Sequence, residues 1–504
     1  MAIRSSMIND PARSSHTRIV FRSAIVSRIL LLTLTVVWRS ILSPYDTSAS
    51  INPSCIASTT DDHHQQLILF PRIAAAIENG IVWDSVYFVR IAQCGYEYEQ
   101  TYAFLPLLPL CISFLSRTVL QPLIPLVGYR AVLALSGYLL SNMSFVFAAL
   151  FLYRLSVIIL KDSEASLRAS ILFCFNPASI FYSSIYSESL YALLSIGGLY
   201  FLMSGANNLA VLSLAFSGCA RSNGVLNAGY IGFQTMHRAY DAVFLQKSAF
   251  LALQVLISGI LRCVFIFIPF IAFQAYGYYN LCDRHAPDKL RPWCKAKIPL
   301  LYNFIQSHYW GVGFLRYFQL KQLPNFLLAS PILSIALCSI IHYVKLRPKE
   351  FFSLGFQVTP KNYGDASMLP SPGINTKNSS LLERETSTVS QEDQARRRRK
   401  SSSKEAGPTV LSTENVSIDK LGKFSIIIIP FVLHLGFMVA TAFFVMHVQV
   451  ATRFLSASPP IYWFASYVLV SPRTRKGWGH LIWGYCAAYI LMGSLLFSNF
   501  YPFT

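Results

Sequence analysis

The chain is poor in charge. Of its 504 residues only 13% are Asp, Glu, Lys or Arg, whereas a soluble domain usually carries about 25%. Hydrophobic residues make up 54% of the chain, and several apolar runs approach the ~20 residues that cross a bilayer. Long unbroken runs, rather than alternating segments, predict transmembrane helices whose backbone groups are bonded within each segment. The fold class is therefore expected to be all-α and polytopic.

The sequence also lacks the motifs of soluble catalysts. It has no P-loop, no dinucleotide fingerprint, no HExxH and no GxSxG, and its ten cysteines form no CxxC pair. The net charge of +19 lies largely at the ends of apolar runs and in one hydrophilic insert, as positive-inside topology requires. We therefore expect no nucleic-acid partner, no metal and no cofactor. The acidic and histidine run at 61–64 is interpreted as a solvated loop, because adjacent side chains cannot all face one ion.

The order of polar and apolar segments predicts the topology. The first apolar run, Ile19–Leu42, follows a long basic stretch without a clear cleavage site, which favours a retained signal anchor with a cytosolic N-terminus over a signal peptide. About ten or eleven spans are expected, with lumenal loops at about 43–102 and 278–323. A membrane core over 1–345 and 424–504 is expected to be interrupted by a disordered, basic cytosolic insert at 346–423.

Two apolar runs are ambiguous. Residues 103–120 contain Pro106 and Pro109, which predicts either a bent span or a helix on the lumenal side. Residues 209–233 contain several polar and glycine residues, so one broken or half-crossing helix is expected near them. In the second loop, Cys282 and Cys294 are separated by eleven residues and could form a disulfide in an oxidising lumen. The alternative is two free cysteines.

The segment Trp83–Pro109 is the strongest functional candidate. It places Asp84, Arg90, Glu97 and Glu99 among aromatic residues in a chain that is otherwise apolar and poor in charge. Acidic residues beside apolar spans are costly and are functional candidates for that reason. The alternative is a solvated loop with its aromatics at the membrane interface.

Three later groups of polar side chains are expected on the same membrane face as this loop. They lie at 186–188 together with 221–223, at 308–310, and at 447–453. Together they predict a cavity for a polar headgroup carried on a lipid tail. The candidate site residues are Trp83, Asp84, Arg90, Glu97, Glu99, Glu188, Arg221, Asn223, His308, Trp310, His447, Gln449 and Arg453.

Several blocks of the chain resemble the PIG-V family. They are WD at 83–84, GYEYE at 95–99, AFLPLLP at 103–109, FNPASIFYSSIYSESLYALL at 175–194, GCARSNG at 218–224, the block at 299–331 and MHVQVATRFLSASPPIYWF at 446–464. The resemblance covers most of the chain outside 1–60 and 346–423. The hydrophilic insert departs from the compact family pattern.

The resemblance implies a GT-C fold in the endoplasmic reticulum membrane and a glycosyl transfer from dolichol-phosphate-mannose. It implies α-1,6 transfer of the second mannose onto a glycosylphosphatidylinositol (GPI) anchor precursor, with inversion at the sugar carbon. Asp84 is then the expected general base. Arg221, His308 and Arg453 are candidates for contact with the donor phosphate, and Trp83 for stacking on a sugar. The alternatives for these residues are a helix-capping role for Asp84, packing for Trp83 and structural ion pairs for the cations.

Two other functions are compatible with the composition. Another dolichol-phosphate-mannose-dependent enzyme, acting on N-glycan precursors or proteins, would share the acidic lumenal loop. A lipid transporter would place substrate groups near the membrane midplane, often in paired repeats, and no such symmetry is present here. Membrane lipids are expected partners, together with a possible small membrane subunit.

Overall fold

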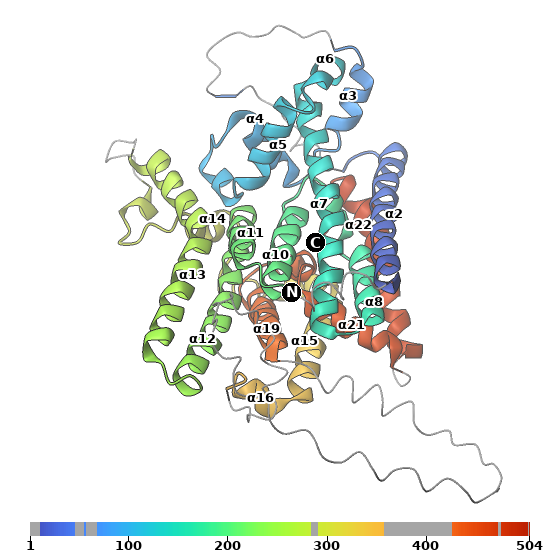
Figure 1. Ribbon diagram of the computed structural model, residues 1–504. Helices are drawn as coiled ribbons and strands as arrows, with labels where there is room; N and C mark the ends of the chain where they lie inside the picture. Colours follow the sequence, from blue (N-terminus) through green and yellow to red (C-terminus); the bar gives the residue numbers. More distant parts are fainter. Residues whose placement is uncertain are drawn as a thin grey trace, which may run out of the picture.

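The computed structural model describes residues 11–45, 55–56, 68–283, 291–356, 426–471, 475–501 and 503. These residues are mostly helical, and no strand occurs among them. Figure 1 shows an elongated bundle with shorter helices gathered at its upper end. The expected all-α, polytopic fold class is confirmed.

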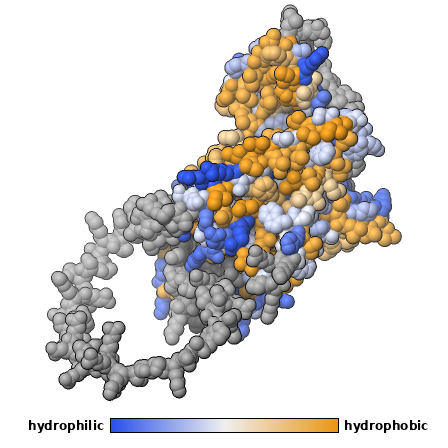
Figure 2. All heavy atoms as spheres, turned by 90° about the vertical axis from the view of Figure 1, so that its right-hand side faces the viewer, coloured by the Kyte–Doolittle hydropathy of each residue, from blue (hydrophilic) through white to orange (hydrophobic). Residues whose placement is uncertain are grey.

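Six helical segments are long and apolar enough to cross a membrane: Arg13–Ile41, Tyr129–Leu160, Ala249–Asp283, Leu320–Leu346, Ile426–Phe444 and Gly477–Ser498. They contain the helices α2 (Pro11–Ile41), α7 (Tyr129–Leu160), α13 (Ala249–Tyr278), α15 (Leu323–Leu346), α19 (Ile429–Phe444) and α22 (His480–Ser498). The protein is a multi-pass membrane protein. Figure 2 shows the broad apolar surface that one face of the bundle presents.

The helices between these segments are shorter than a full span. They include α8 (Ser163–Cys174), α9 (Ser179–Ser183), α10 (Glu188–Met203), α11 (Asn207–Ala220), α12 (Ala228–Phe244) and α21 (Pro459–Val470). Of these, α10 and α11 are apolar but too short to cross a membrane. Polar breaks divide the apolar runs, at 175–178 between α8 and α9 and at 221–227 between α11 and α12. Length and composition therefore give six or seven membrane-length segments in the described part of the chain, fewer than the ten or eleven expected.

Both ambiguous runs are resolved as broken helices. α5 (Leu107–Arg117) is followed by η3 (Gln121–Leu123) and α6 (Ile124–Val127), with a bend of 68° between the two parts. Pro106 lies at the N-cap of α5 and Pro109 in its first turn, where proline is tolerated because no backbone donor is lost. The second run divides into α11, the 3-10 turn η4 (Ser222–Asn227) and α12.

Short helices cap the upper end of the bundle in Figure 1: α3 (Pro71–Glu78), α4 (Ser85–Cys94), α5 and α6. The helix α14 (Leu301–Tyr309) lies beside the upper end of α13. At the lower end, α16 (Pro348–Phe352) follows α15 directly, so the first residues of the expected insert are helical. Residues 357–423 of that insert lie outside the described residues.

Glycines allow close approach between neighbouring helices. A Cβ atom at Gly198 of α10 would come within 2.5 Å of Leu214 in α11, and one at Gly259 of α13 within 2.2 Å of Thr235 in α12. Small residues at such positions let helix backbones pack closely, which replaces the hydrophobic driving force that lipid does not supply. These contacts fix α10, α11, α12 and α13 side by side.

A buried arginine closes the break between α8 and α9. Arg28 of α2 is 3% exposed, and its guanidinium donates to the carbonyl oxygens of Ser179 and Cys174 and to the hydroxyl of Ser183. The guanidinium also lies 3.8 Å from the ring centroid of Phe145. Helix ends leave carbonyl groups unpaired, so Arg28 supplies donors that lipid cannot.

We predict that Arg28→Met lowers the stability of the detergent-solubilised protein by about 3 kcal/mol, because buried carbonyl groups lose charged donors. The measurement is the thermal unfolding midpoint, together with the yield of monodisperse protein. Arg22→Met is the matched control, since Arg22 lies in the same helix and is exposed. Equal midpoints for the two variants would show that Arg28 does not stabilise the break.

Candidate active site

The carboxylate of Asp84 is held by an arginine from the far end of the chain. Asp84 occupies the N-cap position of α4, but its side chain makes no capping hydrogen bond. Instead, its Oδ2 accepts a hydrogen bond from Nη1 of Arg453 at 3.0 Å. The two side chains are 35% and 22% exposed, so the pair is partly open to an incoming substrate. The alternative of a helix-capping aspartate is therefore wrong.

Tyr186 supports both members of this pair. Its hydroxyl accepts a hydrogen bond from the backbone N–H of Asp84 at 3.1 Å. The guanidinium of Arg453 lies 5.8 Å from the ring centroid of Tyr186 and 5.3 Å from that of Phe181, within the range of cation–π attraction. The rings of Phe181 and Tyr186 therefore pack against the guanidinium of Arg453 and help to fix its position.

Electrostatics keep Arg453 charged at this position. Burial alone lowers the pKa of its guanidinium, but the negative charges of Asp84 and Glu188, together with Tyr186 and the hydrogen bond to Asp84, raise that pKa above its ordinary value overall. An opposite charge at hydrogen-bond distance favours the ionised form. The site thus retains a permanent cation next to the Asp84 carboxylate.

A second ion pair lies next to the first. Glu188 begins α10, is 2% exposed, and forms a salt bridge with Arg221, which directly follows α11. The electrostatic influence of Glu188 reaches both Arg453 and Tyr186. The break between α11 and α12 therefore brings Arg221 to the start of α10, where the sequence predicted one functional face.

Polar groups beside Arg221 extend the site. Ser222 donates to the hydroxyl of Tyr302 at 2.8 Å, which connects η4 to α14. The side-chain Nδ2 of Asn223 is buried and has no hydrogen-bond partner in the structure. A buried amide donor without a partner costs free energy, so Asn223 stays a candidate for a contact with substrate.

Trp83, the residue before Asp84, contacts the C-terminal part of the chain. Its indole N–H donates to the carbonyl oxygen of Phe497 at 3.1 Å, and its ring lies 5.8 Å from that of Phe500. The backbone of Trp83 has a φ of 53°, a left-handed conformation that costs a non-glycine residue on the order of 1 kcal/mol. Packing is therefore the interpretation of Trp83 that these contacts favour.

Glu99 joins the two large loops. It is 8% exposed, and its carboxylate accepts hydrogen bonds from the indole of Trp293 at 2.7 Å and the hydroxyl of Tyr309 at 2.8 Å. Arg291 lies 3.4 Å from the same carboxylate. With both oxygens occupied, Glu99 holds the second loop against the first.

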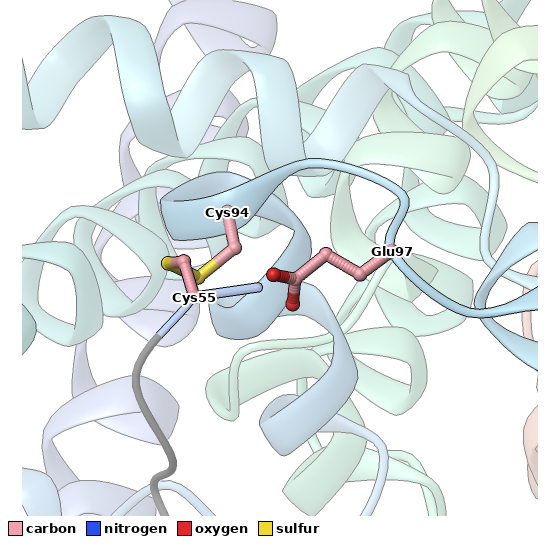
Figure 3. Close-up of side chains that lie close together, drawn as sticks. All are labelled: Cys55, Cys94 and Glu97. Atoms are coloured by element: carbon pink, nitrogen blue, oxygen red, sulfur yellow. A yellow bond between two sulfur atoms is a disulfide. The ribbon is translucent and has the colours of Figure 1, made fainter. Parts of the chain in front are cut away.

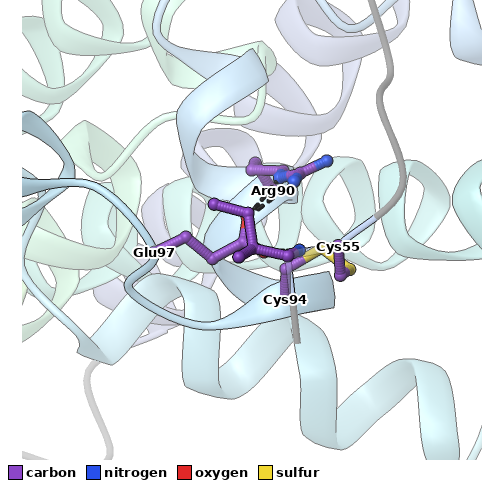
Figure 4. The surroundings of a disulfide bond; sticks show 5 residues. Cys55, Arg90, Cys94 and Glu97 are labelled. Atoms are coloured by element: carbon purple, nitrogen blue, oxygen red, sulfur yellow. Dashed lines mark hydrogen bonds and ion pairs between the residues drawn. A yellow bond between two sulfur atoms is a disulfide. The ribbon is translucent and has the colours of Figure 1, made fainter. Parts of the chain in front are cut away.

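Arg90 and Glu97 form a separate ion pair at 2.6 Å, beside a disulfide between Cys55 and Cys94. Figure 4 shows this arrangement around the disulfide, and the second carboxylate oxygen of Glu97 accepts the backbone N–H of Ile56 at 2.6 Å. The sulfur atoms of Cys55 and Cys94 and the carboxylate of Glu97 lie close enough together for a metal site (Figure 3). Sulfurs joined in a disulfide are not thiolates, and thiolates are the form of cysteine that binds metals. The disulfide and the hydrogen bond to Ile56 therefore join residues 55–56 to the segment that contains Cys94 and Glu97.

A third polar network contains His447, Trp310 and Gln449. A ring nitrogen of His447 is hydrogen-bonded to the carbonyl oxygen of Trp310, and Gln449 accepts a hydrogen bond from the hydroxyl of Tyr317. These hydrogen bonds join the segment before Arg453 to the second loop.

His308 is exposed on α14 and stacks on Phe304, with ring centroids 5.0 Å apart.

The second loop also contains the disulfide between Cys282 and Cys294, the cysteine pair that the sequence indicated. Cys55, Cys94 and Tyr186 are not among the individual site or disulfide residues predicted from the sequence, although Tyr186 begins the polar segment that contains Glu188. Both cysteines lie within the expected lumenal loop at 43–102, which was the available signal. Tyr186 lies two residues before Glu188, and nothing in its spacing indicates that its hydroxyl contacts Asp84.

Comparison with known proteins identifies the family. A family model described as Mannosyltransferase (PIG-V) matches residues 17–504. The chain belongs to the PIG-V mannosyltransferase family. Among its curated relatives, the GPI alpha-1,6-mannosyltransferase 2 of Homo sapiens is 29% identical, with 91% of this chain and 85% of that protein covered. The GPI mannosyltransferase 2 of Drosophila pseudoobscura pseudoobscura is 30% identical, with 84% and 86% covered. No solved structure gives a significant match.

Membership in a mannosyltransferase family agrees with the chemistry available at the site. Two carboxylates and two guanidinium groups, from Asp84, Glu188, Arg221 and Arg453, meet at one end of an apolar bundle. A carboxylate can accept a proton from a sugar hydroxyl, and guanidinium groups can stabilise a departing phosphate.

We predict that Arg453→Gln lowers the rate of mannosyl transfer by about 10²–10³-fold, because removing one preorganised donor from such a site has this effect. The reaction rate in microsomes containing matched amounts of protein is the measurement. Arg117→Gln is the control, because Arg117 is exposed and makes only a 3.3 Å hydrogen bond to Tyr129. Transfer at the wild-type rate by Arg453→Gln would remove Arg453 from the site.

Proposed function

We propose that this protein transfers the second mannose of the GPI anchor, as an α-1,6-mannosyltransferase that uses dolichol-phosphate-mannose as its donor. The relatives described as GPI alpha-1,6-mannosyltransferase 2 and GPI mannosyltransferase 2 support the reaction. The site supports a donor of this class, since four charged groups lie where an apolar bundle meets polar loops. A lipid-linked substrate can then present its sugar to the charges while its tail stays in the membrane.

The observation that carries the proposal is the partly exposed ion pair between Asp84 and Arg453. One carboxylate oxygen of Asp84 is engaged by Arg453, which leaves the other oxygen to accept a proton. A general base has to lie within about 3 Å of the proton that it removes. The exposed edge of Asp84 allows an acceptor hydroxyl to reach that distance.

The reaction is a single displacement. A hydroxyl of the acceptor's first mannose attacks the anomeric carbon of the donor mannose from the face opposite the phosphate, and Asp84 takes the hydroxyl proton. The new C–O bond forms as the bond to the phosphate oxygen breaks, and dolichol phosphate leaves with the bonding electron pair. Because the donor linkage is β, one displacement gives the α product.

The charged residues have distinct roles in this reaction. Arg453 orients Asp84 through the hydrogen bond from its Nη1 to Oδ2. Arg221 and His308 are candidates for the donor phosphate, and Asn223, with its unpaired buried amide, for a sugar hydroxyl. Glu188 holds Arg221 in place. No metal or other cofactor is required by this scheme.

The arrangement of the bundle supports an orientation in the endoplasmic reticulum membrane. Helices α3 to α6 and both disulfides belong to the loops at the end where Asp84 lies, and α16 lies at the opposite end. Disulfides form in oxidising compartments, so the site is assigned to the lumen and the N-terminus to the cytosol. A small membrane subunit is a further proposed partner.

Complementation tests this function. In cells lacking the second GPI mannosyltransferase, wild type is expected to restore GPI-anchored protein at the surface. Asp84→Asn is expected to reduce mannosyl transfer by at least about 10²-fold, the typical contribution of general-base catalysis. The measurements are surface GPI-anchored protein and the lipid precursor that accumulates, which should carry a single mannose.

Asp162→Asn is the matched control. Asp162 is exposed and caps α8 through hydrogen bonds to two backbone N–H groups, and asparagine caps helices equally well. Rescue by Asp84→Asn would remove Asp84 from the reaction and leave the function intact. Failure of wild type despite normal expression would favour a different dolichol-phosphate-mannose-dependent enzyme or a lipid transporter, and assays of N-glycan precursors would separate these two.

A further inference from the structure

The end of α22 and the residues after it reach the Asp84 loop from the other end of the chain. Phe497, Ser498, Asn499 and Phe500 are each at most 6% exposed, although they lie close to the last residue of the sequence. In Figure 1, the upper part of α22 lies between α2 and α7, below the cap of short helices. This segment is therefore packed within the protein.

The segment is fixed on one side by α2. Arg39 donates to the carbonyl oxygen of Ser498 at 2.9 Å. The backbone N–H of Tyr45 donates to the carbonyl oxygen of Asn499, also at 2.9 Å. The ring of Tyr45 lies 5.1 Å from that of Tyr501. These bonds hold the backbone at 498–501 against the first span.

On its other side the segment contacts the groups that place Asp84 and Arg453. The ring of Phe497 lies 5.4 Å from Tyr186, whose hydroxyl accepts the Asp84 N–H, and 5.3 Å from Phe181, which lies beneath Arg453. The carbonyl oxygen of Phe497 accepts the indole N–H of Trp83. One residue thus contacts three of the groups around the ion pair.

Trp83 is the connection that most needs this support. Its left-handed backbone is uncommon for a large side chain and persists only where surrounding contacts hold it. The hydrogen bond to Phe497 and the contact with Phe500 supply those contacts. Because Asp84 is the next residue, the conformation of Trp83 sets the direction in which the Asp84 carboxylate leaves the loop.

The geometry points to residues 497–500 as a positioning element for Asp84, acting through the indole N–H and ring of Trp83. Trp83 is then a positioning residue, with no stacking role on a sugar. The inference rests on the proposed role of Asp84 as the base, and it adds a constraint that the family reaction does not contain.

Two single substitutions test it. Trp83→Phe keeps an aromatic ring and removes the indole donor, and Phe500→Leu removes the ring beneath Trp83. We expect each to lower kcat for mannosyl transfer about tenfold while the KM values for donor and acceptor change less than twofold. A double variant should lose less than the product of the two single effects, because both act on one contact. A sugar-stacking role would instead raise KM in Trp83→Phe and leave Phe500→Leu unaffected.

A readout that does not depend on activity separates this inference from the proposed function. Hydrogen–deuterium exchange of the purified full chain should become faster at the amides of 83–86 in both variants, because the Asp84 N–H is bonded to Tyr186. Trp478→Phe is the matched control, since it makes the same chemical change near the other end of α22, where Trp478 is 63% exposed. Its exchange at 83–86 and its kcat should equal those of wild type.

The outcomes are distinct. Wild type without mannosyl transfer would overturn the proposed function, while exchange at 83–86 would still decide the positioning role. Unchanged exchange and unchanged kcat in both Trp83→Phe and Phe500→Leu would overturn the positioning role while mannosyl transfer by wild type stands.

Discussion

The ion pair between Asp84 and Arg453 joins residues that are 369 positions apart, and the packing of the bundle end follows from it. A carboxylate or guanidinium that is withdrawn from water without a partner carries a desolvation cost, which solvent reduces for this partly exposed pair. Each partner offsets the cost of the other, and the aromatic rings of Phe181 and Tyr186 exclude water from one side of the pair. The loop after the first span and the short helix α20 (Ala451–Leu455) must therefore meet at one place.

The same constraint explains the broken helices. A helix that ends early leaves backbone groups that need partners, and the residues that follow its end can turn toward a site. The break before α9 is closed by donors from Arg28, and the break after α11 places Arg221 against Glu188. Short helices in this bundle are thus part of how the site is assembled.

Much of this could be predicted from the sequence, because the signals are local. Long apolar runs predicted the helical membrane fold. The prolines at 106 and 109 predicted an interrupted run, but the bend of 68° lies after Arg117, about ten residues beyond them. Charged residues next to apolar runs gave Asp84, Glu188, Arg221 and Arg453 as one candidate site, and the structure brings these four together. The cost of burying charge makes such residues visible without any knowledge of their contacts.

The remaining features depend on contacts that no local pattern encodes. Glu97 and Glu99 lie two residues apart, and their spacing does not show that Glu97 pairs with Arg90 and Glu99 with residues about 200 positions later. The partner of Cys94 is Cys55, 39 residues away, and spacing alone does not single out that pair. Apolar composition also does not show where a run breaks, as at 221–227 between α11 and α12.

The net charge of the cluster formed by Asp84, Glu188, Arg221 and Arg453 affects how the site could bind an anionic donor. Two carboxylates and two guanidinium groups sum to zero, so the free site does not attract phosphate through net charge. Each guanidinium presents five N–H donors in a planar fork, and one carboxylate occupies only part of that set. The unused donors of Arg221 and Arg453 can therefore bind phosphate oxygens without breaking the existing pairs. If the proposed function holds, such a site would recognise its donor by directed hydrogen bonds, with its cations neutralised by Asp84 and Glu188 when no substrate is bound.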